Sequence, residues 1–393
     1  MTLGVYHKNC SILIGLAKSL AITLGLDQAF SRLLSDGKSR DRGSKDFEDD
    51  RERVAQARIW FGLFAHDVQH SFANGRPPAM PTDRTFAECR EYLDHPLSIP
   101  PDVRLVALVE LLLLRTPLHI DIQSGISQPD LVVMLAKFKI DLGAWHDYYD
   151  SLMAERLHLS PTSYYRESLR TQREYASLFA NSLLLRGFSE ASDLRTLSDE
   201  AYILAMSAVR SAQTCLDVVI RGSSYPQMLR YSTPHARMCV TFAASFLLRT
   251  ARLFPDRLDP TPVASDVETL ASMLEVAGSA QLAKTLRSIL LRASRSTTTG
   301  DAKTANQTDQ SSSSSEPARR QDNPGLPGGF PDTGESSWHA LFGVPPDSAY
   351  NNISASTLEF QLQDFWASSM GDGLPTGNQN QGQVERVGVL MLG

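Results

Sequence analysis

Cysteine is scarce in this 393-residue sequence, and the four that occur, Cys10, Cys89, Cys215 and Cys239, are far apart. Structural zinc sites and disulfide frameworks need cysteines at close, repeated spacings. The spacing therefore predicts neither a zinc cluster nor a disulfide scaffold, and it favours reduced thiols in the core of an intracellular protein.

Positive charge is not in excess either, because the sequence carries 38 Lys and Arg against 44 Asp and Glu. Residues 295–393 hold 5 of the basic and 11 of the acidic side chains, so residues 1–294 are neutral. Nucleic-acid interfaces normally require clustered Lys and Arg on one face. We therefore expect the chain to reach DNA only indirectly, through a partner.

Long apolar runs are absent from the sequence. The segment from Ser11 to Leu26 contains Lys18 and is followed by no small-residue cleavage site, so it does not read as a signal peptide. The run 105–114 includes Glu110 and is shorter than the ~20 residues that cross a bilayer. The sequence predicts no membrane segment.

Catalytic motifs are also missing. No Gly-x-Ser-x-Gly sequence occurs, and Gly37-Lys38-Ser39 lacks the leading glycine of a phosphate-binding loop, because Arg32 stands there. His66 and His70 have the spacing of two zinc ligands on a helix, but Asp67 replaces the general-base glutamate and no third ligand is evident. The chain is therefore predicted not to be an enzyme, and no metal or cofactor site is predicted in it.

Helical periodicity dominates the residues that remain, and no segment shows sustained two-residue alternation between turns. The fold class predicted is all-α, an irregular multi-helix domain over residues 1–294. Helices are expected over 10–25, ended by Gly25, and over 102–123, with a polar loop over 35–50. Later helices are predicted to begin at capping hydroxyls before proline (Ser160, Thr233), to end at Gly187 and Gly222, and to finish the domain over 264–276 and 279–293.

One helical stretch carries the most specific pattern of the chain. On a helical wheel, one wide apolar arc collects eight side chains, namely Val54, Ala57, Trp60, Phe61, Leu63, Phe64, Val68 and Phe72. Asp67 falls inside this arc, and a carboxylate there needs a cation or several donors. Arg76, in the turn Gly75-Arg76-Pro77, is the candidate, so a buried or half-buried Asp67–Arg76 pair is predicted to hold this turn against the helix.

The same stretch resembles the end of the middle regulatory region of fungal zinc-cluster (Zn2Cys6) transcription factors. The matching residues are Arg58, Trp60, Asp67, Gly75, Arg76 and Pro77. Upstream, the leucine-rich helix ending in Leu24-Gly25-Leu26 is similar to a helix of that family. Downstream, 242–248 followed by Leu253-Phe254-Pro255 is similar to its later core helix. The resemblance covers roughly residues 10–255.

The resemblance implies a nuclear protein that regulates transcription, with coactivators or the transcription machinery as partners. It also implies homo- or heterodimers with full-length relatives and a small-molecule effector, for which no residue stands out. The family's six-cysteine zinc cluster is absent, so zinc is expected only in a missing N-terminal part. We therefore expect an N-terminally shortened member: an incomplete gene model, a truncated paralogue, or a regulator without its own DNA-binding domain.

The C-terminal residues differ from the body in composition. Residues 295–335, rich in Ser, Thr, Pro and Gly, are predicted to be a disordered linker. Residues 336–393 are predicted to be an acidic tail with short amphipathic helices. Its apolar side chains at helical spacing form a predicted coactivator-binding set: Trp338, Leu341, Phe342, Leu358, Leu362, Phe365 and Trp366. The alternative, equally favoured, is that these side chains dock on the body of the same chain.

Two functional hypotheses follow from these patterns. The leading one is a regulatory and activation region of a fungal transcription factor that acts on RNA polymerase II transcription. The alternative is a helical scaffold or competitor that binds full-length relatives and has no activating function.

Overall fold

The computed structural model describes residues 3–36, 44–73, 78–80, 84–123, 126–186, 188 and 191–301. Within these ranges every regular element is a helix and no strand occurs, which confirms the all-α fold class. The α-helices are α1 Leu3–Thr23, α2 Leu26–Asp36, α3 Ser44–Ala73, α4 Arg84–Ala87, α5 Pro100–Gln123, α6 Gln128–Glu155, α7 Tyr164–Ser182, α8 Asp199–Arg221, α9 Tyr225–Met228, α10 Pro234–Leu253, α11 Pro260–Val276 and α12 Ala280–Asp301. The short 3-10 helices are η1 Cys89–Asp94, η2 Leu183–Leu185, η3 Ala191–Thr196 and η4 Leu229–Tyr231.

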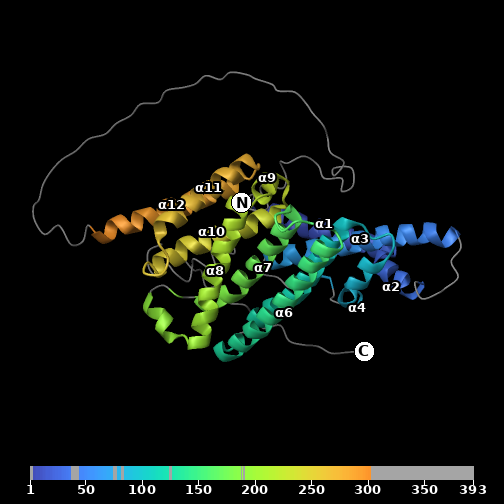
Figure 1. Cartoon of the computed structure of the whole chain (residues 1–393), viewed down its shortest axis with the longest axis horizontal. Helices are drawn as coiled ribbons and strands as arrows, with labels where there is room; N and C mark the ends of the chain where they lie inside the picture. Colours follow the sequence, from blue (N-terminus) through green and yellow to red (C-terminus); the bar gives the residue numbers. More distant parts are fainter. Residues whose placement is uncertain are drawn as a thin grey trace, which may run out of the picture.

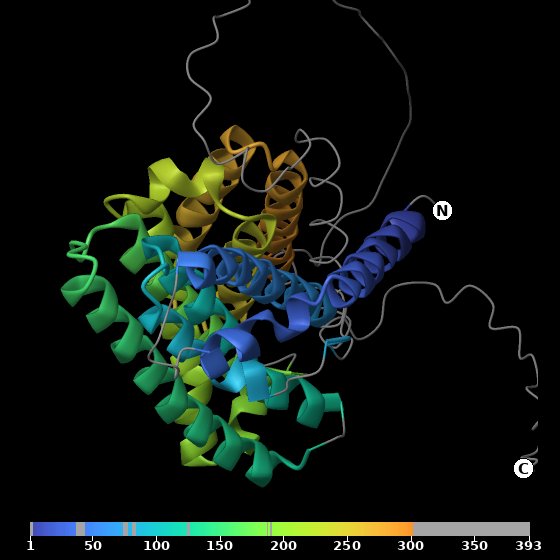
Figure 2. The same ribbon diagram turned by 90° about the vertical axis from the view of Figure 1, so that its right-hand side faces the viewer.

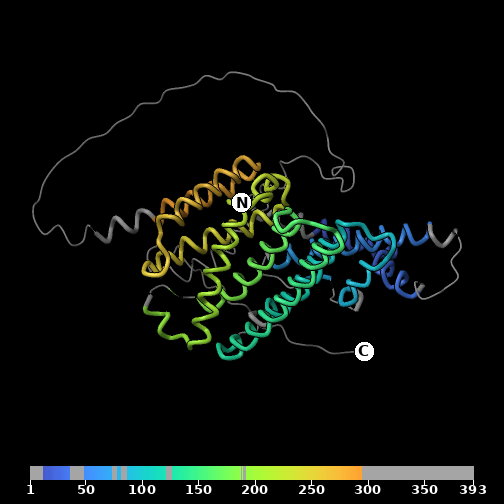
Figure 3. Tube along the Cα trace, in the orientation of Figure 1, coloured from blue at the N-terminus to red at the C-terminus, as the bar shows by residue number. Residues whose placement is uncertain are grey.

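The helices pack in chain order across the molecule (Figure 1). Helices α1 to α4 lie at one end, α10 to α12 lie at the other, and α6, α7 and α8 lie between them, as the colour gradient of Figure 3 also shows. The helix pairs with the most extensive contacts are α7 with α8, α11 with α12, and α2 with α3. One hydrophobic core runs without interruption from Ala21 to Ile289.

Several helix ends lie where the sequence predicted them. Gly25 adopts a φ of +73° between α1 and α2, a conformation that glycine tolerates without strain. Gly222 follows the last residue of α8, and the Thr233 side chain accepts a hydrogen bond from the backbone N–H of Ala236 at the start of α10. The thiols of Cys89, Cys215 and Cys239 are free and buried, as expected for core cysteines.

Other predicted boundaries are wrong. The polar segment 35–50 is not one loop, because α2 continues to Asp36 and α3 begins at Ser44. Helix α7 begins at Tyr164 after Ser163, so the hydroxyl of Ser160 does not cap it as predicted. Helix α12 runs to Asp301 and is longer than the helix predicted over 279–293. At α2, α3 and α12 a polar or Ser/Thr-rich segment joins a helix that is anchored by its apolar neighbours.

Helix α8 is long and apolar enough to cross a membrane, as is the bent pair formed by α1 and α2 taken together. In the structure α8 packs against α7 and α10, and half of its most apolar window is buried inside the protein. A core helix of a helical domain has the same composition, so its apolar character is explained by these contacts.

The predicted linker beyond residue 301 and the acidic tail lie outside the described residues. The seven tail side chains from Trp338 to Trp366 are therefore not placed by the structure, and their role remains a prediction. Gly75, Arg76 and Pro77 of the turn after α3 also lie outside the described residues, as does Gly187.

Candidate functional site

The apolar face of α3 forms the core of the first half of the protein. Seven of the eight side chains in the predicted arc are buried, and Leu63 is partly buried. The Trp60 indole stacks on Phe86 of α4, with ring centroids 6.2 Å apart, and Phe64 stacks on the same ring at 4.0 Å. The aromatic residues of the motif helix thus attach α4 to α3.

Arg58 joins α3 to the start of α5. Its Nε and Nη2 atoms donate to the two carboxylate oxygens of Asp102 at 2.7 and 2.9 Å, a bidentate ion pair. Asp102 is 1% exposed and also accepts a hydrogen bond from the backbone N–H of Ile99 at 2.9 Å. The hydrogen bond to Asp102 raises the pKa of Arg58, so the guanidinium stays charged. Arg58 therefore has a structural partner that lies 44 positions away, and local sequence spacing gives no sign of it.

Asp67 is 3% exposed, so its carboxylate lies in the core where the helical wheel placed it. Its Oδ2 atom accepts hydrogen bonds from the backbone N–H groups of Ala79 and Met80 at 3.0 and 2.8 Å. These two residues follow the predicted turn Gly75-Arg76-Pro77 in the sequence, so Asp67 fixes the chain directly after these residues. The sequence indicated a cation or several donors for this carboxylate, with Arg76 as the candidate. Arg76 lies outside the described residues, and the backbone donors leave no residue-specific signal in the sequence.

A buried arginine lies where α3, α5, α7 and α10 converge. Arg115 of α5 is 4% exposed, and its guanidinium carbon lies 5.4, 5.2 and 5.2 Å from the ring centroids of Phe72, Tyr175 and Phe179. No carboxylate among the described residues pairs with it. Its side chain interacts with that of Tyr175, whereas its Nε has no hydrogen-bond partner. The sequence signal that could have revealed it is an arginine directly after the apolar run 105–114.

Neutral polar groups surround Arg115. The His119 ring is stacked between Phe72 and Phe179, at centroid distances of 3.6 and 4.7 Å. Burial and the charge of Arg115 lower the pKa of His119 to about 2, and the same causes lower that of His235 to about 3. Both imidazoles are therefore uncharged near neutral pH.

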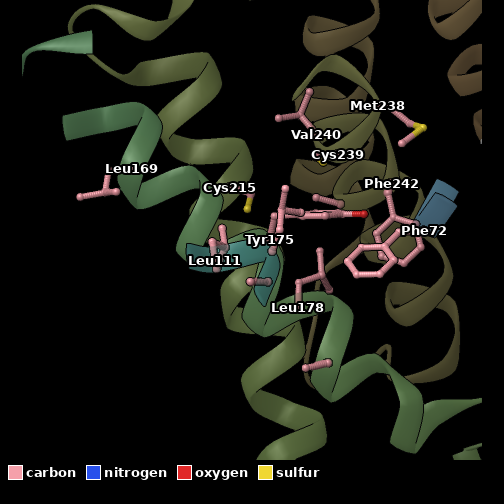
Figure 4. Close-up of a cluster of buried hydrophobic side chains, with 14 of the residues drawn as sticks. Phe72, Leu111, Leu169, Tyr175, Leu178, Cys215, Met238, Cys239, Val240 and Phe242 are labelled. Carbon is pink, nitrogen blue, oxygen red and sulfur yellow. The ribbon is translucent and has the colours of Figure 1, made fainter. Parts of the chain in front are cut away.

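The core beside this cluster is drawn in Figure 4, where the Tyr175 ring and Cys239 lie among apolar side chains. The Cys239 sulfur lies 3.5 Å from Nε2 of His235, the spacing of a weak hydrogen bond. Burial raises the pKa of Cys239 to about 12, so it stays a protonated thiol and is a poor nucleophile. The cluster thus offers one permanent positive charge inside aromatic walls, and no activated catalytic group.

The pair His66 and His70 lies on α3 on either side of Asp67, whose carboxylate points to the backbone of Ala79 and Met80. Across the described ranges, no three His, Cys, Asp or Glu side chains gather closely enough to hold a metal ion.

A shallow groove of about 780 Å³ opens on the surface beside α11. Its walls come from α9, η4 and α11, and the residues that line it are Pro226, Gln227, Leu229, Arg230, Ser265, Glu268, Thr269, Ser272, Met273, Val276 and Ala277. The side chains of the groove are mostly small or apolar, with one basic and one acidic residue, and none is positioned for chemistry.

Comparison with known proteins relates the chain to a regulator of transcription. Over 250 residues it is 25% identical to the transcriptional activator of proteases prtT from Emericella nidulans. The chain is a distant homologue of a fungal transcriptional activator. The matched region covers 61% of this chain but 35% of that protein. No protein-family model matches the chain, and no solved structure matches it.

Proposed function

We propose that this chain is a regulatory region of a fungal zinc-cluster transcription factor and acts in the nucleus on RNA polymerase II transcription. The observation that carries the proposal is the similarity to a transcriptional activator, which extends over 250 residues and 61% of this chain. The motif residues Arg58, Trp60 and Asp67 give further support to the proposal, because they hold the helices of the body together.

The activating surface in this proposal is the set of tail side chains Trp338, Leu341, Phe342, Leu358, Leu362, Phe365 and Trp366. Their spacing is that of amphipathic helices, and Glu359 and Asp364 lie beside them. Short acidic and aromatic helices of this kind bind hydrophobic grooves of partner proteins. The partner proposed is a coactivator or another component of the transcription machinery.

The body is proposed to take a small-molecule effector at Arg115. Arg115 has no carboxylate partner among the described residues and contacts only neutral groups, Tyr175 among them. Burial of a charge with neutral partners alone is costly, and a bound anion would lower that cost. Phe72, Tyr175 and Phe179 surround the guanidinium and would provide apolar contacts to the same ligand. A small organic acid has both the negative charge for Arg115 and the apolar surface for the three aromatic rings.

The second candidate function is a scaffold or competitor that binds full-length relatives without activating transcription. The near neutrality of residues 1–294 fits this hypothesis as well as the first, since these residues offer no excess of basic charge for DNA. Under both hypotheses the chain reaches DNA through a partner.

Chromatin immunoprecipitation of the tagged chain, with and without a full-length relative in the same cells, tests the proposal and separates the two functions. We expect enrichment at promoters in the presence of the relative, together with raised transcript levels of those genes. Enrichment with lowered transcript levels favours the competitor. No enrichment in either strain contradicts a role at promoters.

A further inference from the structure

The groove beside α11 lies along one face of that helix. The α11 residues that line it run from Ser265 to Val276 at steps of three and four residues, which places their side chains on one side of the helix. The opposite side packs into the body through Val267, Leu270 and Leu274, each 0% exposed, whereas Val276 is 85% exposed. Figures 1 and 2 both show α11 and α12 together at one edge of the molecule.

The groove carries one positive charge that no acidic side chain among the described residues balances. Arg230 lines the groove and is exposed, and its guanidinium carbon lies 5.0 Å from the ring centroid of its neighbour Tyr231. The acidic residue of the lining, Glu268, accepts a hydrogen bond from Nε of Arg287 at 2.9 Å, so it is already paired. An occupant with apolar side chains and a carboxylate beside them is therefore complementary to this groove.

A segment of the C-terminal tail has this composition. Residues 321–385 contain eight Asp and Glu and no Lys or Arg. The apolar face of the helix predicted over 356–366 consists of Leu358, Leu362, Phe365 and Trp366. Glu359 lies at the border of this face, one helical step from Leu358. The predicted helix is ~16 Å long, and so is the stretch of α11 that lines the groove.

The covalent connection keeps this segment close to the groove. Helix α12 packs against α11 and ends at Asp301, and the tail follows it in the sequence. The 54 residues from 302 to 355, treated as a flexible chain, have a root-mean-square end-to-end distance of ~40 Å. A segment on such a tether reaches an effective concentration on the order of 1 mM at the groove. Contacts too weak to bind a free partner therefore suffice for the tethered segment.

We propose that the tail segment 356–366 docks as a helix in the groove beside α11 of its own chain. Its apolar face fills the groove, and Glu359 pairs with Arg230. The docking adds one step to the proposed function, because a coactivator that binds the same side chains must first displace them. The docking itself does not depend on a role in transcription.

The exposed apolar side of α1 suits this segment less well. Leu16 and Leu20 are 61% and 60% exposed there, so α1 also offers apolar contacts. Lys18 is the sole charged residue from Ile12 to Leu24, and its Nζ donates to the backbone carbonyl of Ala79 at 2.6 Å. Helix α1 thus leaves Glu359 without a free cation, whereas the groove provides Arg230.

Hydrogen exchange of the full chain, measured at about 1 and about 100 μM protein, tests the docking. A docked state that is populated nine-tenths of the time slows the exchange of the amides of 356–366 about tenfold. We expect this protection at both concentrations, because the contact is intramolecular. Arg230→Glu should lower the protection at least about threefold. The matched control Arg195→Glu reverses the charge of an exposed arginine of η3 and should exchange as the wild type does.

The reciprocal variant Arg230→Glu/Glu359→Arg restores opposite charges and should restore the protection, which a general loss of stability would not do. Unprotected amides over 356–366 in the wild type overturn the inference. Protection that appears only at the higher concentration also overturns it, because a second copy is then the occupant. So does protection that is unchanged in Arg230→Glu or not restored in the reciprocal variant. None of these results bears on whether the tail activates transcription, which a reporter measures separately.

Discussion

The buried Asp67 carboxylate is shielded from water and accepts hydrogen bonds from the backbone N–H groups of Ala79 and Met80. In Asp67→Ala these amides lose their acceptor, and the Met80 amide is left unsatisfied in the core. We expect a loss of about 2–3 kcal/mol in the free energy of unfolding, measured by urea denaturation. The control Asp141→Ala removes a surface ion pair with Lys137 and should cost less than about 1 kcal/mol. Equal stability of Asp67→Ala and the wild type would contradict the contact.

Replacing Arg115 is expected to have the opposite effect on stability, because a buried charge without a carboxylate partner opposes folding. In Arg115→Met a flexible apolar side chain of similar length keeps the contacts with Phe72, Tyr175 and Phe179. The melting temperature should stay the same or rise, while any effector response of the protein should be lost. A clear drop in melting temperature would show that the contacts of Arg115 with Tyr175 and the aromatic rings outweigh the cost of burying its charge.

The histidines beside Arg115 predict a dependence of stability on pH. Their folded pKa values, about 2 for His119 and about 3 for His235, lie below the ordinary value near 6.5. The unfolded chain therefore binds more protons below pH 6.5, and stability is present above that pH and lost as the pH falls toward 3. Each histidine contributes a slope of at most about 1.4 kcal/mol per pH unit.

Urea denaturation at pH 7 and pH 5 measures this slope. The variant His119→Phe keeps the stacking between Phe72 and Phe179 and should lose less stability between the two pH values than the wild type does. An unchanged pH dependence in His119→Phe would mean that His119 is protonated or exposed in the folded protein.

At the scale of elements, Glu167 of α7 fixes the connection between α8 and α9. Its carboxylate accepts hydrogen bonds from the backbone N–H groups of Ser223, Ser224 and Tyr225 at 2.7, 3.0 and 2.6 Å. Glu167→Gln replaces one acceptor oxygen with an N–H donor and should cost about 2 kcal/mol. Thermal unfolding of this variant and of the surface control Glu155→Gln makes the comparison. A cost equal to that of the control would rule out the three bonds.

Local patterns of the sequence predict the helices well, but they predict poorly which side chains of different helices contact one another. Apolar periodicity identifies α3, α5, α8 and α10, because the buried face of a helix repeats every three to four residues. The pairing of Arg58 with Asp102 joins helices distant in sequence, and amphipathic spacing contains no information on it. The cluster around Arg115 could not be predicted from the sequence for the same reason, because its aromatic rings come from α3 and α7, which are distant in sequence from Arg115.

At the scale of the whole molecule, the described body and the C-terminal residues have different compositions. The core from Ala21 to Ile289 is one continuous hydrophobic cluster, so the described body is expected to unfold as one cooperative unit. The excess acid of the sequence lies in residues 295–393, outside that core. In our proposal the body holds the effector, and the tail binds the transcription machinery.

A reporter assay tests the central claim most directly. The full chain is fused to an unrelated DNA-binding domain and compared with the same fusion lacking residues 336–370 and with the DNA-binding domain alone, at matched protein levels. The account predicts reporter transcription well above that of the DNA-binding domain alone, and a return toward that level when 336–370 are removed. A full-chain fusion that leaves the reporter at the level of the DNA-binding domain, or a deletion without effect, would contradict an activating role of this tail.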